Sequence, residues 1–185
     1  LSFQRILKLS KREILEHWNN LPQSIAFIQE KRLDPSHEYV FDQTKPIRLS
    51  KFRSELATNI KIDRVLIEGK GWPSQSLNPK QVIRQELPDW HLDKLSKLNK
   101  KFRYVSALEN VHHPNYVTEK IFDAYASMSI PIYYARKDHF AYKLAQKSSF
   151  LNLYGLTIEE SVASIEAFQP TIEFVERYME DIRHM

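Results

Sequence analysis

Residues 104–134 read YVSALENVHHPNYVTEKIFDAYASMSIPIYY, and the rest of the chain is organised around this stretch. The apolar run 104–108 predicts a strand, and 109–116, with one proline and two asparagines, predicts a loop. From Thr118, a residue type suited to an N-cap, apolar residues recur at 121, 124, 125 and 128, the spacing of one helix face. Residues 130–134 form a second apolar run. The stretch therefore predicts a strand, a loop, a helix and a second strand.

The residues that suggest chemistry lie where the loop meets the helix. Lys120 falls in the first helical turn, among backbone N–H groups that have no helical partner. A cation there opposes the helix dipole, whereas a bound phosphate would accept those N–H groups and pair with the lysine. Glu119 could accept hydrogen bonds from sugar hydroxyls. The same spacing is also typical of an exposed Glu-Lys pair on a solvated helix end, so spacing alone leaves both interpretations open.

A longer pattern separates the two interpretations. It comprises Glu109-Asn110, then NYVTEK at 115–120, then DAY at 123–125 and IPI at 130–132. With these gaps, the run resembles the signature of the alpha-1,3-fucosyltransferase family. The chain departs from that signature at Leu108, where a phenylalanine is usual, and at Ala135, where a glycine is usual.

The resemblance implies the C-terminal, donor-binding half of a GT-B glycosyltransferase, which is an α/β Rossmann-like domain with a mainly parallel, doubly wound sheet. The alternation of strands and helices along the chain favours the same fold class. We expect an amphipathic helical segment over residues 1–21 and a nucleotide-sugar-binding domain, including a C-terminal helix, over residues 22–185.

The remaining elements follow from periodicity and turn residues. Strands are expected at 24–29, 60–67 and 150–154. Helices are expected at 48–57, at 93–101 (lysine-rich and expected to be solvated), from Thr157 to a break at Pro170, and at 171–185. Residues 139–146 predict a short helix or turn. Gly69 and Gly71 follow the second strand, where they would let the backbone approach a ligand or simply form a tight turn.

The resemblance also assigns roles to residues of the site. Asn110 and Tyr116 would contact the nucleotide sugar, Glu119 would hold the ribose hydroxyls, and Lys120 would hold the diphosphate. We expect no cofactor and no essential metal; GDP-fucose is expected as the donor substrate.

The family also uses an arginine on the early helix to clamp the diphosphate. Arg48 is the first candidate for this role. It lies one residue further from Leu56 than the family spacing suggests, so Lys51 or Arg53 could take its place.

The implied function is binding of GDP-fucose and inverting transfer of fucose to a hydroxyl of an N-acetylglucosamine- or glucose-containing glycan. The family places the general base on an N-terminal domain, which this chain is expected to lack, so the isolated chain is expected to be inactive and the full-length protein a fucosyltransferase. Glu109 is the nearest internal candidate for a base, but it is expected to support the loop. The alternative is a non-catalytic module that binds a nucleotide sugar or a protein.

Charge and cysteine content limit the cellular location and the classes of ligand to be expected. The 185 residues carry a formal charge of +4 and no cysteine, which excludes disulfides and thiolate metal sites. Animal members of the resembled family work in an oxidising lumen and use disulfides, so the resemblance together with the lack of cysteine favours a bacterial, cytoplasmic protein. The charge suits an anionic ligand without a nucleic-acid motif, and the basic amphipathic N-terminus leaves open peripheral contact with the inner membrane surface. His112 and His113 are adjacent and belong to no metal-binding pattern. The partners that the resemblance implies are a nucleotide sugar, a glycan acceptor and the N-terminal domain.

Overall fold

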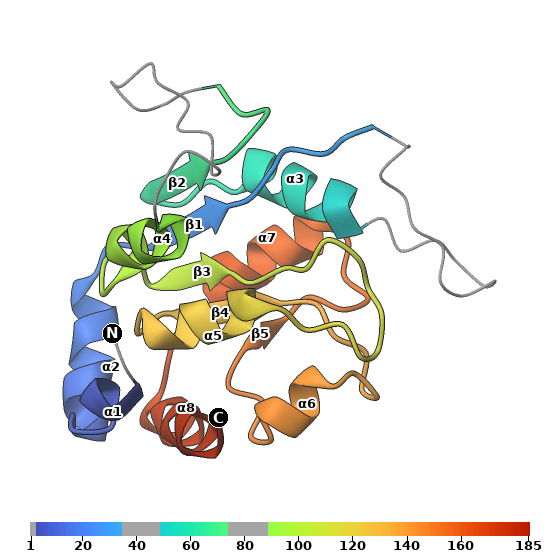
Figure 1. The fold of residues 1–185 in the computed structure, drawn as a ribbon. Helices are drawn as coiled ribbons and strands as arrows, with labels where there is room; N and C mark the ends of the chain where they lie inside the picture. Colours follow the sequence, from blue (N-terminus) through green and yellow to red (C-terminus); the bar gives the residue numbers. More distant parts are fainter. Residues whose placement is uncertain (1–2, 35–48, 74–88) are drawn as a thin grey trace.

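The computed structural model describes residues 3–34, 49–73 and 89–185. A parallel sheet forms the centre of the molecule (Figure 1). Its strands are β1 (Ser24–Ile28), β2 (Arg64–Glu68), β3 (Tyr104–Ser106), β4 (Ile130–Tyr133) and β5 (Leu151–Asn152). They are arranged in the order β2-β1-β3-β4-β5, and every neighbouring pair is parallel. All of these strands therefore end at the same edge of the sheet.

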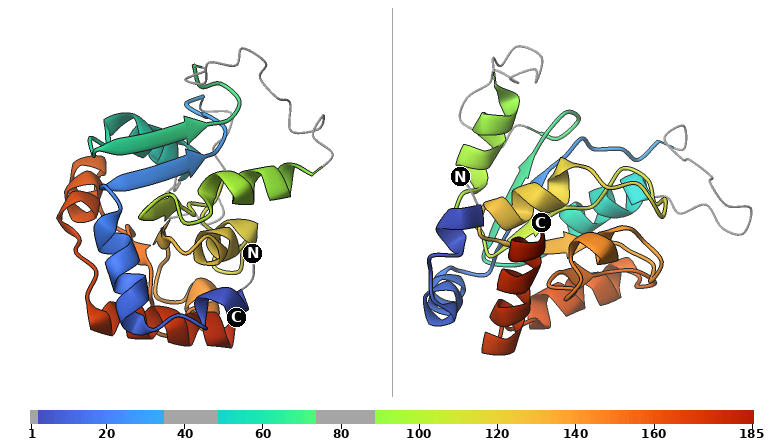
Figure 2. Two further views of the ribbon diagram at one scale, coloured as in Figure 1. Left: turned by 90° about the vertical axis from the view of Figure 1, so that its left-hand side faces the viewer. Right: turned by 60° about the horizontal axis from the view of Figure 1, so that its bottom comes forward.

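Helices cover both faces of the sheet, as the doubly wound prediction requires. Figure 2 shows α3 (Leu49–Asn59) and α7 (Ile158–Ala167) on one face, and α4 (Trp90–Leu98) and α5 (Glu119–Ala126) on the other. The remaining helices are α1 (Phe3–Ile6), α2 (Lys11–Asn20), α6 (Ala141–Leu144) and α8 (Ile172–His184). The predicted α/β Rossmann-like fold with a parallel sheet is confirmed.

The N-terminal region, expected as one amphipathic helical segment over residues 1–21, contains two helices. It forms α1 and α2, because Ser10 starts a new helix with a capping box in which its hydroxyl and the Glu13 carboxylate bond each other's backbone N–H groups. Trp18 is fully buried, packs edge-on against Tyr178 of α8, and donates its indole N–H to the Met128 carbonyl at 2.9 Å. The apolar face of α2 is thus covered by the domain itself. The boundary between residues 21 and 22 and the membrane contact stay predictions.

Two expected boundaries were wrong. The second strand begins at Arg64 rather than at residue 60, because Ile60 is buried at the end of α3, where its N–H bonds the Leu56 carbonyl. Helix α4 begins at Trp90 rather than at residue 93, because Asp89 caps it by accepting the Leu92 N–H. Lys94 in this helix is only 5% exposed, which contradicts the expectation of a solvated segment.

The glycine turn after β2 has a packing explanation. Gly69 has φ +138°, and a Cβ added there would lie 2.2 Å from the Gln29 carbonyl oxygen. The close approach is therefore between the ends of β1 and β2, which favours the tight-turn interpretation over contact with a ligand.

The described helices do not have the length and apolar character of membrane-spanning helices. In the three described ranges, every helix is too short or too polar to cross a lipid bilayer.

Candidate functional site at the carboxyl edge of the sheet

The strand order reverses direction at one place along the carboxyl edge, between β1 and β3. β1 lies between β2 and β3, so the chain leaves β1 toward one side of the sheet and later returns to form β3 on the other. Loops that follow two such strands diverge, and ligands of open α/β sheets bind in the resulting crevice. Here the two loops are those beginning at Gln29 and at Ala107.

Arg53 of α3 joins these two loops. Its Nη1 donates to Asn110 Oδ1 at 2.5 Å, after β3, and its Nη2 donates to the Glu30 carbonyl at 3.3 Å, after β1. The side chain is 2% exposed, and no described residue accepts a hydrogen bond from its Nε. Burial, helped by nearby Arg32, lowers the pKa of Arg53 to about 10, so the guanidinium stays charged at neutral pH.

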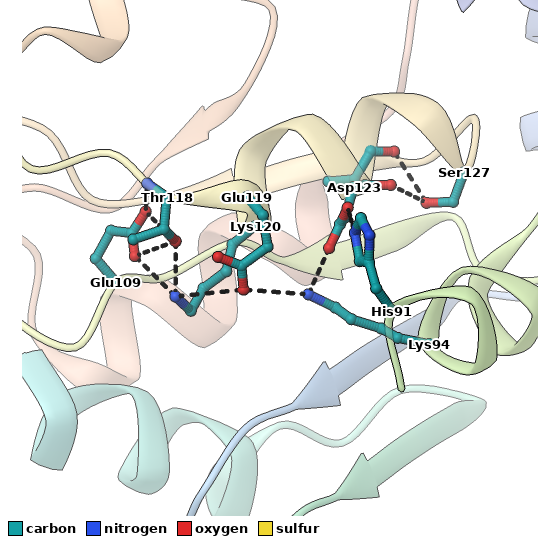
Figure 3. A network of polar contacts seen from close by, with 9 residues as sticks. His91, Lys94, Glu109, Thr118, Glu119, Lys120, Asp123 and Ser127 are labelled. Atoms are coloured by element: carbon teal, nitrogen blue, oxygen red, sulfur yellow. Dashed lines mark hydrogen bonds and ion pairs between the residues drawn. The ribbon is translucent and has the colours of Figure 1, made fainter. Parts of the chain in front are cut away.

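Glu109 organises the junction between the β3 loop and α5. Its carboxylate is 2% exposed and accepts the Thr118 N–H at 2.8 Å, the Thr118 hydroxyl at 2.8 Å and Lys120 Nζ at 2.9 Å (Figure 3). Thr118 is the N-cap by position, as predicted, but it makes no side-chain capping bond because Glu109 engages its hydroxyl. A carboxylate held by this many donors supports the loop, as expected for Glu109.

The Lys120 ammonium group uses two of its three N–H donors in hydrogen bonds to neighbouring residues. Its Nζ donates to Glu109 Oε2 at 2.9 Å and to Thr118 Oγ1 at 2.8 Å. An ammonium group has three N–H donors, so one remains for a further acceptor. The side chain is 16% exposed, at the N-terminal end of α5, where the helix dipole favours anions.

Glu119 and Tyr116 complete the predicted set. Burial alone would raise the pKa of Glu119, but Lys120, its own backbone N–H and Lys94 outweigh this and lower it, so the carboxylate is ionised at neutral pH. Burial and the charges of Glu109 and Glu119 raise the pKa of Tyr116, which therefore stays a neutral hydroxyl. Asn110, Tyr116, Glu119 and Lys120 thus all lie on the β3 loop and the first turn of α5.

The three arginine-clamp candidates have different outcomes. Arg48 lies outside the described residues. Lys51 is 40% exposed and pairs with Glu55 one turn along α3, at 3.5 Å. Arg53 contacts Asn110 directly and is the described candidate that the structure brings to the site.

Four site residues were not foreseen from the sequence. The Tyr133 hydroxyl is buried beside Glu109, and burial together with the Glu109 charge strongly raises its pKa. Asp123 of α5 is buried, and His91 and Lys94 of α4 both contact it. The NYVTEK motif carries no information on these residues, because α4 reaches α5 only through packing.

Across residues 3–34, 49–73 and 89–185, no three His, Asp or Glu side chains gather in a way that could hold a metal ion. His112 packs against the rings of Tyr134, His139 and Tyr154.

A parallel, doubly wound sheet with a basic, hydrogen-bonded helix N-terminus beside its switch point defines an α/β domain of the Rossmann-like class. Residues 43–179 match the sequence model of a protein family, glycosyltransferase family 10 (fucosyltransferase), C-terminal region. The chain therefore belongs to this family. Searches among curated proteins and among solved structures returned no match.

Proposed function

We propose that this domain binds GDP-fucose and supports inverting transfer of its fucose to a hydroxyl of an N-acetylglucosamine- or glucose-containing glycan. Family membership supports a donor-binding role in a fucosyltransferase. The observation that carries the proposal is the position of Lys120 Nζ, fixed by Glu109 and Thr118 at the N-terminus of α5 with one N–H in reserve. An anionic diphosphate meets a directed cation and free backbone N–H groups there.

The proposed mechanism is electrostatic. As the bond between the sugar and the diphosphate breaks, negative charge grows on the leaving phosphate, and preorganised cations stabilise that charge. We assign this role to Lys120, with Arg53 as the second cation across the crevice. Glu119 would hold the ribose hydroxyls, and Asn110 and Tyr116 would contact the nucleotide sugar.

The base that takes the acceptor proton would come from outside this domain. Glu109 is the internal carboxylate closest to the donor motif, but it is buried and accepts hydrogen bonds from Thr118 and Lys120. A base needs a free lone pair within reach of the acceptor hydroxyl. We therefore propose a carboxylate of the N-terminal domain that the family resemblance implies.

The departure at Ala135 does not favour the alternative of a non-catalytic module. Among the described non-glycine residues, only Lys100, Met128 and Ser148 have positive φ, so Ala135 has a backbone conformation that any residue can adopt. Its N–H and carbonyl are both bonded by the Asn152 side chain, at 2.9 and 2.8 Å. Alanine is thus accommodated here without strain.

The first prediction tests the role of Lys120 by calorimetry with GDP, UDP and guanosine. We expect the chain to bind GDP in preference to UDP. We expect Lys120→Met to weaken GDP binding by roughly 10- to 100-fold, the value of a charge-assisted hydrogen bond, and to leave guanosine binding unchanged. Lys147→Met is the matched control, because Lys147 is an exposed lysine paired with Glu180 of α8. Equal weakening of GDP and guanosine would assign Lys120 to folding and contradict the proposal.

A further inference from the structure

Three carboxylates in the network of Figure 3 differ in what they can still bind. Glu109 and Asp123 are 2% and 5% exposed, and each contacts a lysine directly, at 2.9 and 2.7 Å. Glu119 is 37% exposed and lies 4.0 Å from Lys120 Nζ and 3.9 Å from Lys94 Nζ. It is therefore the member of the three that both faces solvent and is not tied to a lysine at hydrogen-bonding distance.

Both lysines approach the same oxygen of Glu119. The two ion pairs end on Oε1, and Figure 3 shows the second carboxylate oxygen turned away from them. Two cations near one oxygen attract it electrostatically and so favour the orientation of the carboxylate in which Oε2 faces away from the lysines.

Lys94 can act in this way because its own position is fixed. Its side chain is 6% exposed, and its Nζ pairs with Asp123 Oδ2 at 2.7 Å. His91, one turn earlier on α4, places Nε2 2.7 Å from the other oxygen of Asp123. Lys97 ties the same helix to Glu68 at the end of β2, at 2.9 Å. A cation anchored at this many points does not move away when Glu119 takes up a ligand.

We propose that Lys94 is a positioning residue of the donor site, which holds Glu119 between two anchored lysines so that its free oxygen faces the ribose hydroxyls of the nucleotide. The proposal rests on the proposed function for the identity of the ligand. It extends the site to helix α4, which lies outside the signature motif. Lys94 itself touches no donor atom in this scheme and acts through Glu119.

The ionisation of Glu119 provides a readout that does not require nucleotide. The charged or titratable groups around it are His91 and Lys94 of α4, Lys120 and Asp123 of α5, and Glu109 and Tyr116 of the β3 loop. Lys94 and Lys120 lower the pKa of Glu119, so removing Lys94 must raise it. A role confined to holding α4 against α5 would change stability and leave this pKa unmoved.

The experiment compares the double variant Lys94→Met/Asp123→Asn with Asp123→Asn. The double variant avoids leaving a buried carboxylate unpaired, which would itself destabilise the fold. The Glu119 carboxyl is titrated by carbon-13 NMR, and binding of GDP and of 2′,3′-dideoxy-GDP is measured by calorimetry. We expect the Glu119 pKa to rise in the double variant and the preference for GDP over its dideoxy analogue to fall by roughly tenfold. Lys101→Met, at an exposed lysine just past the end of α4 whose Nζ donates to the Ser96 carbonyl, should change neither quantity.

The outcomes distinguish failure of the positioning role of Lys94 from failure of the proposed function. An unmoved Glu119 pKa or an unchanged preference in the double variant overturns the positioning role of Lys94. Equal binding of GDP and the dideoxy analogue by the unaltered chain overturns the ribose role of Glu119, and failure of the unaltered chain to bind GDP overturns the proposed function on which this inference rests. Lys94→Arg, which keeps the charge, should retain most of the preference for GDP.

Discussion

At the scale of single residues, Arg53 is a buried cation held by directed contacts on both sides of the crevice. Asn110 and the Glu30 carbonyl accept from its two terminal nitrogens, and its pKa of about 10 keeps it charged at neutral pH. A planar guanidinium can make both contacts at once, whereas an ammonium group is a single point of charge. The residue therefore joins the two loops as well as supplying charge.

The second prediction follows from these contacts. Arg53→Met should weaken GDP binding by roughly 10- to 100-fold and destabilise the fold by about 1–3 kcal/mol, because two part-buried acceptors lose their donor. Arg53→Lys should recover only part of each effect. Calorimetry and urea denaturation measure the two quantities. Lys51→Met is the control on the same helix, and a larger loss of GDP affinity in that variant would move the clamp to Lys51.

The candidate site shows which residues a sequence motif can identify. Glu119 and Lys120 were assigned from NYVTEK because adjacent residues at a helix start share one location whatever the rest of the fold does. Arg53 was named only as a substitute for Arg48, because helix periodicity gives a face but not a distance to another loop. Lys94 was missed, and Asp123, although part of the signature, was given no role, since a buried ion pair between two helices has no local spacing signal.

At the scale of elements, the order of strands and helices was predictable from periodicity, and several boundaries were not. The break before α2 had a signal, since Ser10 and Glu13 have the capping-box spacing. The start of α4 depends on Asp89, which follows a stretch with little periodicity. The start of β2 depends on burial of Ile60 against the core, which only the assembled fold determines.

The third prediction concerns the end of α4. Lys100 follows the C-cap residue Asn99 with φ 58°, a left-handed conformation that costs a residue with a Cβ about 1 kcal/mol. Lys100→Gly should therefore stabilise the protein by about 0.5–1 kcal/mol in urea denaturation. Lys101→Gly is the matched control, because Lys101 is not among the described residues with positive φ, and it should be neutral or destabilising. Stabilisation by both variants would show that the left-handed backbone at Lys100 is not the cause.

At the scale of the whole molecule, stability depends on pH through buried histidine. His139 is 2% exposed, and its Nδ1 accepts the Ala141 N–H at 3.1 Å. Burial, with the charge of His112 adding to it, lowers the pKa of His139 from 6.5 to about 4. Between these values the unfolded chain binds a proton that the folded chain does not. Stability is therefore full above pH 6.5 and falls as the pH drops toward 4.

The fourth prediction uses this window. The free energy of unfolding should fall by roughly 3 kcal/mol between pH 7 and pH 4 on account of His139, and His112 and His17, whose pKa values are also lowered, act in the same direction. His139→Asn keeps an acceptor near the Ala141 N–H but cannot titrate, so its pH profile should be flatter. His184→Asn on α8 is the control. An unchanged slope in His139→Asn would place the acid sensitivity elsewhere.

The alternation of charge along the network has a consequence for how a nucleotide arrives. Lys120 is neutralised by Glu109 and Lys94 by Asp123, so neither lysine projects a long-range field into solvent. Mobile ions screen attraction between separated charges but have little effect on contacts made after water has been expelled. Capture of the donor should therefore owe little to diffusional steering, and its lifetime in the crevice should be the quantity that sets affinity.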